Sequence, residues 1–393
     1  MSSRSTLEFL KTETGSGLLL AASALLAILW ANSPGSGAYF ALIDHSIAVR
    51  LGPFGEEMSL GGWVKTALMP VFFFIVGLEI KQEVVRGELS NPRRLALPIL
   101  AALGGVAVPA LIYLAFNAGQ TGHPQGWPTP VATDIAFALA ALAMVAPRLP
   151  PPLRVFLLTL AIADDLVAVA LIALVFSHDV RPWMLGGALA TVGVLAAMSR
   201  WRSAPYVFWT IGFILLWGFT LKSGVNTSIA GVAAAMCIPL QSKKPGRPGV
   251  LDEVMEALHP YVAFFILPLF AFTAAGFAIG GLPAGAITGP VALGVGLGLF
   301  LGKQVGVFGA AALAIGLKLA RRPTGAKWLE LYGVSVLCGI GFTMSLYIGA
   351  LAFPAGPEQA EVRLGVVSGS LASTLWGMAV LGWAQARRSR EPG

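Results

Sequence analysis

The chain has 393 residues, of which 56% are hydrophobic and only 11% are charged. A soluble domain carries about 25% charged residues, so this composition excludes an ordinary soluble enzyme and indicates a polytopic membrane protein. The net charge of +7 does not indicate nucleic-acid binding, because the basic residues lie in short clusters between apolar runs. Cys237 and Cys338 each lie inside an apolar run, and a disulfide scaffold is not supported.

Apolar runs of membrane-spanning length recur along the whole chain. We expect about twelve spans of roughly 20 residues each, in an all-α protein with no soluble domain. The first run follows Arg4 and Lys11, and we interpret it as a retained span rather than a cleaved signal peptide. The predicted spans cover residues 13–31, 66–85, 95–116, 122–146, 151–176, 183–199, 205–220, 224–240, 251–276, 287–314, 328–353 and 362–385.

The loops between these spans indicate the orientation. Most lysine and arginine residues fall in alternate loops on one side, which predicts that both termini are cytoplasmic. The loop after the first span has a different character. Residues 46–60 alternate polar and apolar side chains around Gly52 and Pro53, which predicts a short external β-hairpin.

Two predicted spans are interrupted near their middles. The fourth contains the run Thr129–Asp134, in which Pro130 removes a backbone donor and disfavours helix before it. The eleventh contains Gly339 and Gly341. These spans are second in the groups 3-4-5 and 10-11-12. Interrupted helices in matching positions of two halves point to an inverted-repeat transporter with its site at the midplane of the bilayer.

Four ionisable residues lie deep inside the predicted spans: Asp134, Asp164, Asp165 and Lys303. A charged group at this depth costs roughly 2.5–3.5 kcal/mol on the milder scales, so such residues are functional by default. Neighbouring residues on a helix point about 100° apart, so Asp164 and Asp165 cannot face one partner. One of the two can line a water-filled cavity while the other faces a neighbouring helix, where Lys303 is the candidate partner.

The chemistry of these groups suits a small hard cation. Asp134 can offset the partial positive charge of two helix N-termini, and Thr133 adds a hydroxyl oxygen beside it. Carboxylate and hydroxyl oxygens favour ions such as Na⁺, and no His or Cys cluster indicates zinc or copper. We expect no resident cofactor. Protons and Na⁺ would compete for the two adjacent carboxylates, and two protons per Na⁺ would move net charge in each cycle.

Six stretches of the chain resemble the NhaA family of bacterial sodium/proton antiporters, in order and in spacing. They are GLEIKQE (77–83), ATDIAFALA (132–140), LTLAIADDL (158–166), SGVNTSIAGV (223–232), LHPYVAFFILPLFAF (258–272) and LCGIGFTMSLYI (337–348). NhaA is one of the transporters that illustrate the inverted-repeat rule, so agreement with that rule is not independent support. The resemblance covers nearly the whole chain.

The resemblance implies a single transmembrane antiporter domain. Its core bundle would comprise spans 3–5 and 10–12, with crossed, broken spans 4 and 11, and the other spans would form the interface part. The implied activity is electrogenic exchange of Na⁺ or Li⁺ for H⁺ by alternating access across the bacterial inner membrane, serving pH and sodium homeostasis. The hairpin at residues 46–60 would form a homodimer contact.

The resemblance also implies roles for individual residues. Asp165 would be the principal cation ligand, and Asp164 the proton carrier or gate. Asp134 and Thr133 would match the family's helix-end aspartate and threonine, and Lys303 its membrane lysine. Whether Lys303 or Asp164 delivers the second proton stays open.

The family's cytoplasmic funnel, whose charges tune activity with pH, is only partly matched. The candidate pH-response residues here are Glu79, Glu83, Asp252, Glu253, Glu256 and His259. The chain departs from the best-known family pattern at Met255, Glu256, Asn226 and Thr66. We therefore predict a pH profile shifted from the family's usual alkaline activation.

Three other classes of membrane protein are alternatives to an antiporter. An intramembrane aspartyl protease would need two aspartates on different helices, such as Asp134 and Asp165, but no GxGD string exists and Lys303 stays unexplained. A cation channel would show a filter or charged ring, and none is seen. A sodium-coupled symporter with a similar inverted fold is the most serious rival, and sodium-driven uptake of an organic solute would identify it.

Overall fold

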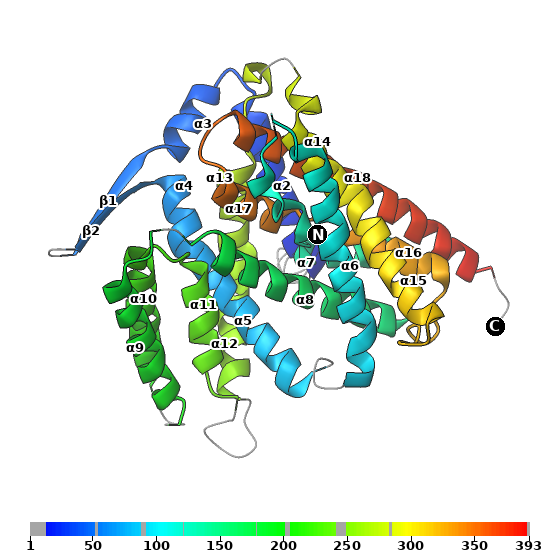
Figure 1. The fold of residues 1–393 in the computed structure, drawn as a ribbon, viewed down its shortest axis with the longest axis horizontal. Helices are drawn as coiled ribbons and strands as arrows, with labels where there is room; N and C mark the ends of the chain where they lie inside the picture. The colour runs from blue at the N-terminus through cyan, green and yellow to red at the C-terminus, as the bar shows by residue number, and fades with distance from the viewer. Residues whose placement is uncertain are drawn as a thin grey trace, which may run out of the picture. The chain divides into compact units, whose positions relative to one another are not determined.

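The computed structural model of the chain describes residues 13–51, 54–87, 92–120, 122–177, 179–200, 205–240, 249–282 and 285–390. Within these ranges the chain is mainly helical, with one two-stranded antiparallel sheet (Figure 1). The chain termini, Arg4, Lys11 and the predicted turn at Gly52 and Pro53 lie outside the described residues.

Helices follow one another along most of the chain and are named as in Figure 1. The α-helices and strands are α2 (Glu13–Ala31), α3 (Ser36–Ile43), β1 (Ser46–Leu51), β2 (Phe54–Ser59), α4 (Leu60–Trp63), α5 (Met69–Arg86), α6 (Pro92–Asn117), α7 (Ile135–Val145), α8 (Pro151–Val175), α9 (Pro182–Met198), α10 (Tyr206–Ser223), α11 (Ser228–Cys237), α12 (Val250–Tyr261), α13 (Leu267–Ala275), α14 (Pro290–Leu297), α15 (Gly309–Gly316), α16 (Trp328–Leu337), α17 (Phe342–Ala352) and α18 (Pro357–Arg388). The π-helical segments are η1 (Val64–Leu68), η5 (Val262–Ile266), η8 (Gly298–Gly302) and η9 (Gln304–Phe308). The 3₁₀ turns are η3 (Pro124–Gly126), η4 (Thr129–Val131), η6 (Ile279–Gly281) and η7 (Ala286–Thr288).

The length and apolar character of these helices make the chain a multi-pass membrane protein. Eight helical segments among the described residues are long and apolar enough to cross a bilayer, or ten if two bent pairs each count as one span. Two shorter apolar helices, α9 and α11, lie at the sixth and eighth predicted spans. The number of twelve crossings stays a prediction.

The chain divides into two compact units. Unit 1 comprises residues 1–32, 91–168 and 274–393, and unit 2 comprises residues 33–90 and 169–273. Unit 1 therefore holds the predicted spans 3, 4, 10, 11 and 12 and most of span 5, and it also holds the first predicted span, which the core bundle expected from the sequence does not include. It also holds all four ionisable residues predicted at bilayer depth.

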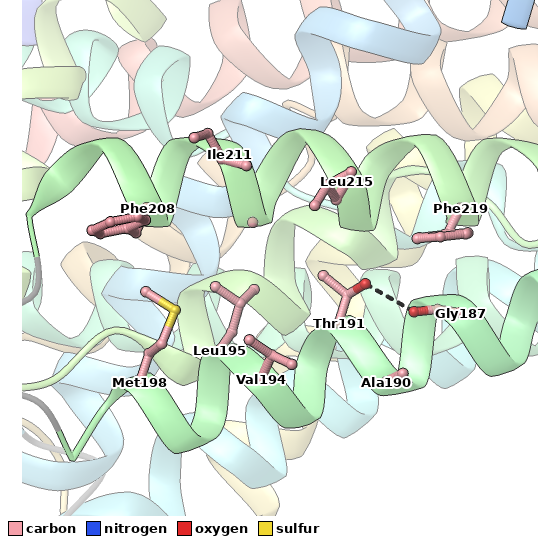
Figure 2. A pocket seen from close by; sticks show the side chains of 11 residues that line it. Gly187, Ala190, Thr191, Val194, Leu195, Met198, Phe208, Ile211, Leu215 and Phe219 are labelled. Carbon is pink, nitrogen blue, oxygen red and sulfur yellow. Dashed lines mark hydrogen bonds between the residues drawn. The ribbon is translucent and has the colours of Figure 1, made fainter.

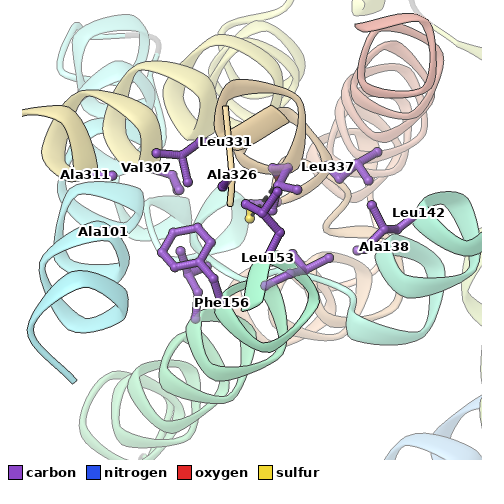
Figure 3. Close-up of a cluster of buried hydrophobic side chains, with 14 of the residues drawn as sticks. Ala101, Ala138, Leu142, Leu153, Phe156, Val307, Ala311, Ala326, Leu331 and Leu337 are labelled. Atoms are coloured by element: carbon purple, nitrogen blue, oxygen red, sulfur yellow. Dashed lines mark hydrogen bonds between the residues drawn. The ribbon is translucent and has the colours of Figure 1, made fainter. Parts of the chain in front are cut away.

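Unit 1 has an apolar core that contains both small and large side chains (Figure 3). Alanines such as Ala101, Ala138 and Ala311 let the helix backbones approach, while Leu153 and Phe156 of α8 fill the space between them. Lipid tails are themselves apolar, so burying apolar side chains between helices gives little hydrophobic stabilisation in a membrane. Close van der Waals packing of this kind holds the helices together instead.

Both predicted interruptions lie in unit 1. The eleventh span is broken between α16 and α17, which are bent by 42°. The fourth span differs more from expectation, because its first half consists of η3 and η4 rather than one continuous helix. Pro124, Pro128 and Pro130 explain this, since each lacks a backbone N–H for the helical ladder. Residues 132–134 follow without helix and lead into α7.

Unit 2 contains the paired strands β1 and β2. Their register runs from Ser46 opposite Ser59 to Leu51 opposite Phe54, within the residues predicted to form a hairpin. Lys222, in the last turn of α10, forms an ion pair with Glu56 of β2. The short helix α3, between the first span and the strands, was not predicted from the sequence.

Candidate functional site

The centre of unit 1 contains a buried ion pair. Asp164 lies on α8, and Lys303 lies between the π-helical segments η8 and η9. Both side chains are 0% exposed, and Lys303 Nζ lies 2.6 Å from Asp164 Oδ2. The lysine therefore pairs with Asp164 rather than with Asp165, a choice that the sequence left open. Asp165 is buried too, at 2% exposure, and as the next residue on the helix it points about 100° away from Asp164.

Irregular helix geometry surrounds Lys303. Segments η8 and η9 are π-helical turns on either side of it, and such turns often occur at functional sites. The backbones of α6 and η9 nearly touch at Gly104 and Gly306, where a Cβ atom on either glycine would overlap the other's carbonyl oxygen. A Cβ on the next residue, Gly105, would lie 3.6 Å from Lys303 Nζ. The lysine side chain thus extends along α6 toward Asp164, in space that glycines leave free.

Thr133 connects this ion pair to the broken eleventh span. Its Oγ1 lies 2.7 Å from Asp164 Oδ2 and 2.9 Å from the carbonyl oxygen of Cys338, at the end of α16. Both neighbours accept hydrogen bonds when Asp164 is ionised, and a threonine hydroxyl has only one proton to donate. The hydroxyl can therefore serve the carboxylate or the carbonyl, but not both fully.

Asp134 lies where two helix N-termini meet. As the N-cap of α7, its Oδ1 accepts a hydrogen bond from the Phe137 N–H (3.2 Å). Its Oδ2 accepts from the N–H and the hydroxyl of Thr343 on α17, at 3.0 and 2.5 Å. The Asp134 N–H donates to the Ile340 carbonyl (2.6 Å). A carboxylate in this position offsets the partial positive charge of both helix ends.

The eleventh-span break is packed too tightly for side chains. A Cβ on Gly339 would lie 2.5 Å from the Leu299 carbonyl oxygen, and one on Gly341 would lie 2.9 Å from the Ala132 carbonyl oxygen. Pro130 is buried in η4, and its ring would contact a Cβ on Gly298 at 2.8 Å. The interrupted segments and the tenth span therefore meet backbone against backbone beside Asp164 and Lys303.

The oxygen atoms gathered here suit a small hard cation. The Asp164 carboxylate and the Thr133 hydroxyl lie 2.7 Å apart, and the buried Asp165 carboxylate belongs to the next residue along α8; all three are hard oxygen ligands. Asp164 Oδ1 has no hydrogen-bond partner among the described residues, so it has lone pairs to offer a ligand. No group of three or more His, Cys, Asp or Glu side chains comes together within the described ranges.

Comparison with known proteins assigns the chain to a family. The sequence profile of the Na⁺/H⁺ antiporter 1 family matches residues 7–381. The chain belongs to the Na⁺/H⁺ antiporter 1 family. This is a family of transporters, not of enzymes.

Full-length relatives agree with that assignment. The chain is 48% identical over 374 residues to the Na(+)/H(+) antiporter NhaA 2 of Pseudomonas syringae pv. syringae, an alignment that covers 95% of this chain and 93% of the relative. It is 48% identical over 375 residues to the Na(+)/H(+) antiporter NhaA of Nitrobacter hamburgensis (95% and 90% covered). It is 46% identical over 389 residues to that of Pseudomonas putida (98% and 97% covered).

The candidate pH-response residues of this antiporter-family member lie in unit 2. Glu79 and Glu83 are on α5, and Asp252, Glu253, Glu256 and His259 are on α12. Asp252 joins the two helices, because its Oδ2 lies 3.3 Å from Arg86 Nη1 at the end of α5. Glu253 accepts a hydrogen bond from the Tyr206 hydroxyl, while Glu256 and His259 are exposed.

Thr66 and Asn226, where the chain departs from the best-known family pattern, have local structural roles. Thr66 lies in the π-helical turn η1, and its carbonyl accepts hydrogen bonds from Trp217 Nε1 (2.7 Å) and the Thr227 hydroxyl (3.0 Å). Asn226 accepts from the Ser228 N–H at the start of α11. Met255 and Glu256 belong to α12.

A groove elsewhere in this antiporter-family member is lined mainly by apolar side chains. Figure 2 shows it between α9 and α10 in unit 2. The described residues that line it include neither a carboxylate nor an amine. Thr191, its polar side chain, donates a hydrogen bond to the Gly187 carbonyl within α9 (2.8 Å).

Sequence reasoning missed two members of the site. Thr343 provides two of the hydrogen bonds to Asp134, and the Cys338 carbonyl contacts Thr133. The signal for Thr343 was present, because a hydroxyl residue just after a glycine-rich break lies at a helix N-terminus. The role of a single backbone carbonyl leaves no mark in the sequence.

Proposed function

We propose that this chain is an electrogenic antiporter that exchanges cytoplasmic Na⁺ or Li⁺ for external H⁺ by alternating access. Its family membership supports antiport of Na⁺ and H⁺. The observation that carries the proposal is the Asp164 carboxylate, which is fully buried and shared by Lys303 and Thr133. A buried charge with exchangeable partners can accept a proton or a metal cation in place of its lysine.

In the proposed cycle, Na⁺ binds the carboxylates of Asp165 and Asp164 with help from Thr133. Asp165 is the principal ligand. Na⁺ and protons compete for these oxygens, so the binding of Na⁺ releases the protons. On the other side of the membrane, protons bind again and release the Na⁺. Two protons leave for each Na⁺. One of them comes from Asp164, or from Lys303 when Na⁺ has bound the Asp164 carboxylate with which the lysine was paired. The net charge moved makes exchange respond to the membrane potential.

The proposed architecture has twelve spans in an inverted repeat, with the broken fourth and eleventh spans crossing at the site. The hydrogen bonds from Thr133 and Asp134 to residues 338–343 support the crossing. The proposed core bundle contains spans 3–5 and 10–12. The grouping of residues 91–168 and 274–393 in unit 1 supports it, although unit 1 also includes residues 1–32 with the first span. Asp134 compensates charge at the broken helix ends, and Lys303 takes part in proton coupling through its ion pair with Asp164.

We further propose that the protein lies in the bacterial inner membrane with both termini in the cytoplasm. The distribution of lysine and arginine among alternate loops supports this orientation. The strands β1 and β2 would then lie outside the membrane, where an exposed strand edge suits a homodimer contact. The physiological role would be pH and sodium homeostasis.

The proposed pH response would involve Glu79, Glu83 and the charged residues of α12. The Arg86–Asp252 pair supports coupling between α5 and α12 within unit 2. Exchange measured in everted vesicles from roughly pH 6 to roughly pH 9 tests the predicted shift of the profile. A conventional alkaline switch would show that the departures at Met255, Asn226 and Thr66 do not matter.

Proton release on addition of Na⁺ tests the shared-carboxylate mechanism. Purified wild-type protein is compared with Asp164→Asn and Asp165→Asn, and Asp179→Asn serves as an exposed control with the same change of charge. We expect both site variants to lose most of the proton release and the control to retain it. Normal release by both site variants would refute the mechanism.

A further inference from the structure

Three segments of unit 1 meet at one end of the unit. The Arg148 N–H donates a hydrogen bond to Gln385 Oε1 (3.2 Å), and Arg388 Nη2 donates to the Gly325 carbonyl (3.0 Å). These contacts bring together residues 146–154, 317–330 and 381–390. We call this surface the basic end.

The basic end has a large excess of positive charge. Within the described residues of these three segments there is one acidic side chain, that of Glu330, and it is 0% exposed. Glu330 is already engaged by Arg388 (2.6 Å) and by the Lys327 N–H (2.8 Å), so it cannot neutralise groups outside. The basic residues are Arg148, Arg154, Lys318, Arg321, Arg322, Lys327, Arg387, Arg388 and Arg390.

Two exposed tryptophans lie among these charges, and each carries an arginine over its ring. Arg387 Cζ lies 3.8 Å from the ring centroid of Trp383, and Arg322 Cζ lies 5.4 Å from that of Trp328. The tryptophans are 52% and 42% exposed. Tryptophan favours the interface between lipid and water. A guanidinium stacked on its face keeps N–H groups free for phosphate oxygens.

Lys318, at this surface, occupies a backbone position that usually holds glycine. α15 ends in a Schellman motif, in which the Leu319 N–H bonds to the Ala314 carbonyl (2.9 Å) and the Lys318 N–H to the Ile315 carbonyl (3.1 Å). Lys318 therefore takes the left-handed position, with φ of 59°. Glycine is the usual residue there, because a side chain adds strain. A lysine at a position where glycine would be less strained points to a role other than stability.

We propose that the basic end binds the headgroups of anionic phospholipids. The positive residues attract the phosphate, and the tryptophans hold the surface at the interface. Leu317 and Leu319 flank Lys318 and are 68% and 61% exposed. Apolar side chains interleaved with cations suit a lipid, which offers both hydrocarbon and phosphate, better than a soluble anion. The proposal does not depend on ion exchange.

The test measures the melting temperature of the full chain in neutral detergent. Short-chain phosphatidylglycerol, phosphatidylcholine or inorganic phosphate is added separately. We expect phosphatidylglycerol to raise the melting temperature and the other two to leave it unchanged. The rise should fall by half or more in Arg321→Gln/Arg387→Gln. It should persist in Arg50→Gln/Arg181→Gln, which removes the same charge from exposed residues of unit 2.

Lys318→Gly provides a second, independent readout. Without lipid this variant should melt at a higher temperature than wild type, because strain is relieved, yet its rise with phosphatidylglycerol should be smaller. An equal rise with phosphatidylcholine or with inorganic phosphate would overturn the proposal. So would an equal rise with phosphatidylglycerol in both double variants, because the lipid would then bind elsewhere.

Discussion

Replacing Lys303 by alanine tests how the buried ion pair supports the fold. The variant leaves Asp164 fully buried without its cation, 2.6 Å from where the ammonium stood. Removing one partner of a buried pair costs about 3–5 kcal/mol, whereas removing both costs much less. We therefore expect a large loss of stability in Lys303→Ala that adding Asp164→Asn partly restores. Exchange in the single variant should suffer less than stability.

The assay is thermal unfolding of purified protein at neutral and acid pH. A protonated Asp164 needs no cation, so the penalty of Lys303→Ala should shrink as the pH falls. Val307→Ala, at a fully buried position one turn along the same segment, provides a cavity control whose cost should not depend on pH. Unchanged melting of Lys303→Ala, or costs that simply add in the double variant, would refute the reasoning.

Two further predictions follow from packing and charge in unit 1. Gly339→Ala places a methyl group against the Leu299 carbonyl and should lower stability by about 1–3 kcal/mol, as overpacking does, with a matching fall in melting temperature. Arg388→Gln leaves the Glu330 carboxylate buried without its cation and should cost about 3 kcal/mol, measured in the same way.

Each of these changes has a matched control in the same unit. Gly309→Ala adds the same methyl group at a position where no atom beyond its own stretch of helix lies within 4 Å, and it should be neutral or stabilising. Arg387→Gln removes an exposed guanidinium next to Arg388 and should change stability little in detergent. Equal effects of a variant and its control would show that the structural contact is unimportant.

Much of the site was predictable because its residues are costly at bilayer depth. Asp164, Asp165 and Lys303 stand out by charge alone, and Gly339 and Gly341 mark the break. The pairing of Lys303 was not predictable. Asp164 and Asp165 differ only in their direction from α8, and apolar residues surround that helix, so no polar face fixes its rotation.

The fold was predictable to a similar degree. The strand residues and most helical ranges follow from alternation and apolar length. The π-helical turns beside Lys303 were not predicted, because they depend on how η8 and η9 pack on α6 rather than on local sequence. Before Asp134, several prolines do more than interrupt the predicted helix: 3₁₀ turns stand in place of its first half.

The hydrogen bonds between the two breaks also limit how the protein can move. Residues 133–134 and 338–343 are joined by four hydrogen bonds of 2.5–3.0 Å between buried groups. Separating them would strand donors and acceptors where little water can replace the lost partners, at about 1–3 kcal/mol for each unsatisfied group. The two interrupted segments should therefore travel as one rigid block. A transport cycle in which they slide past each other would have to break the contacts that stabilise Asp134.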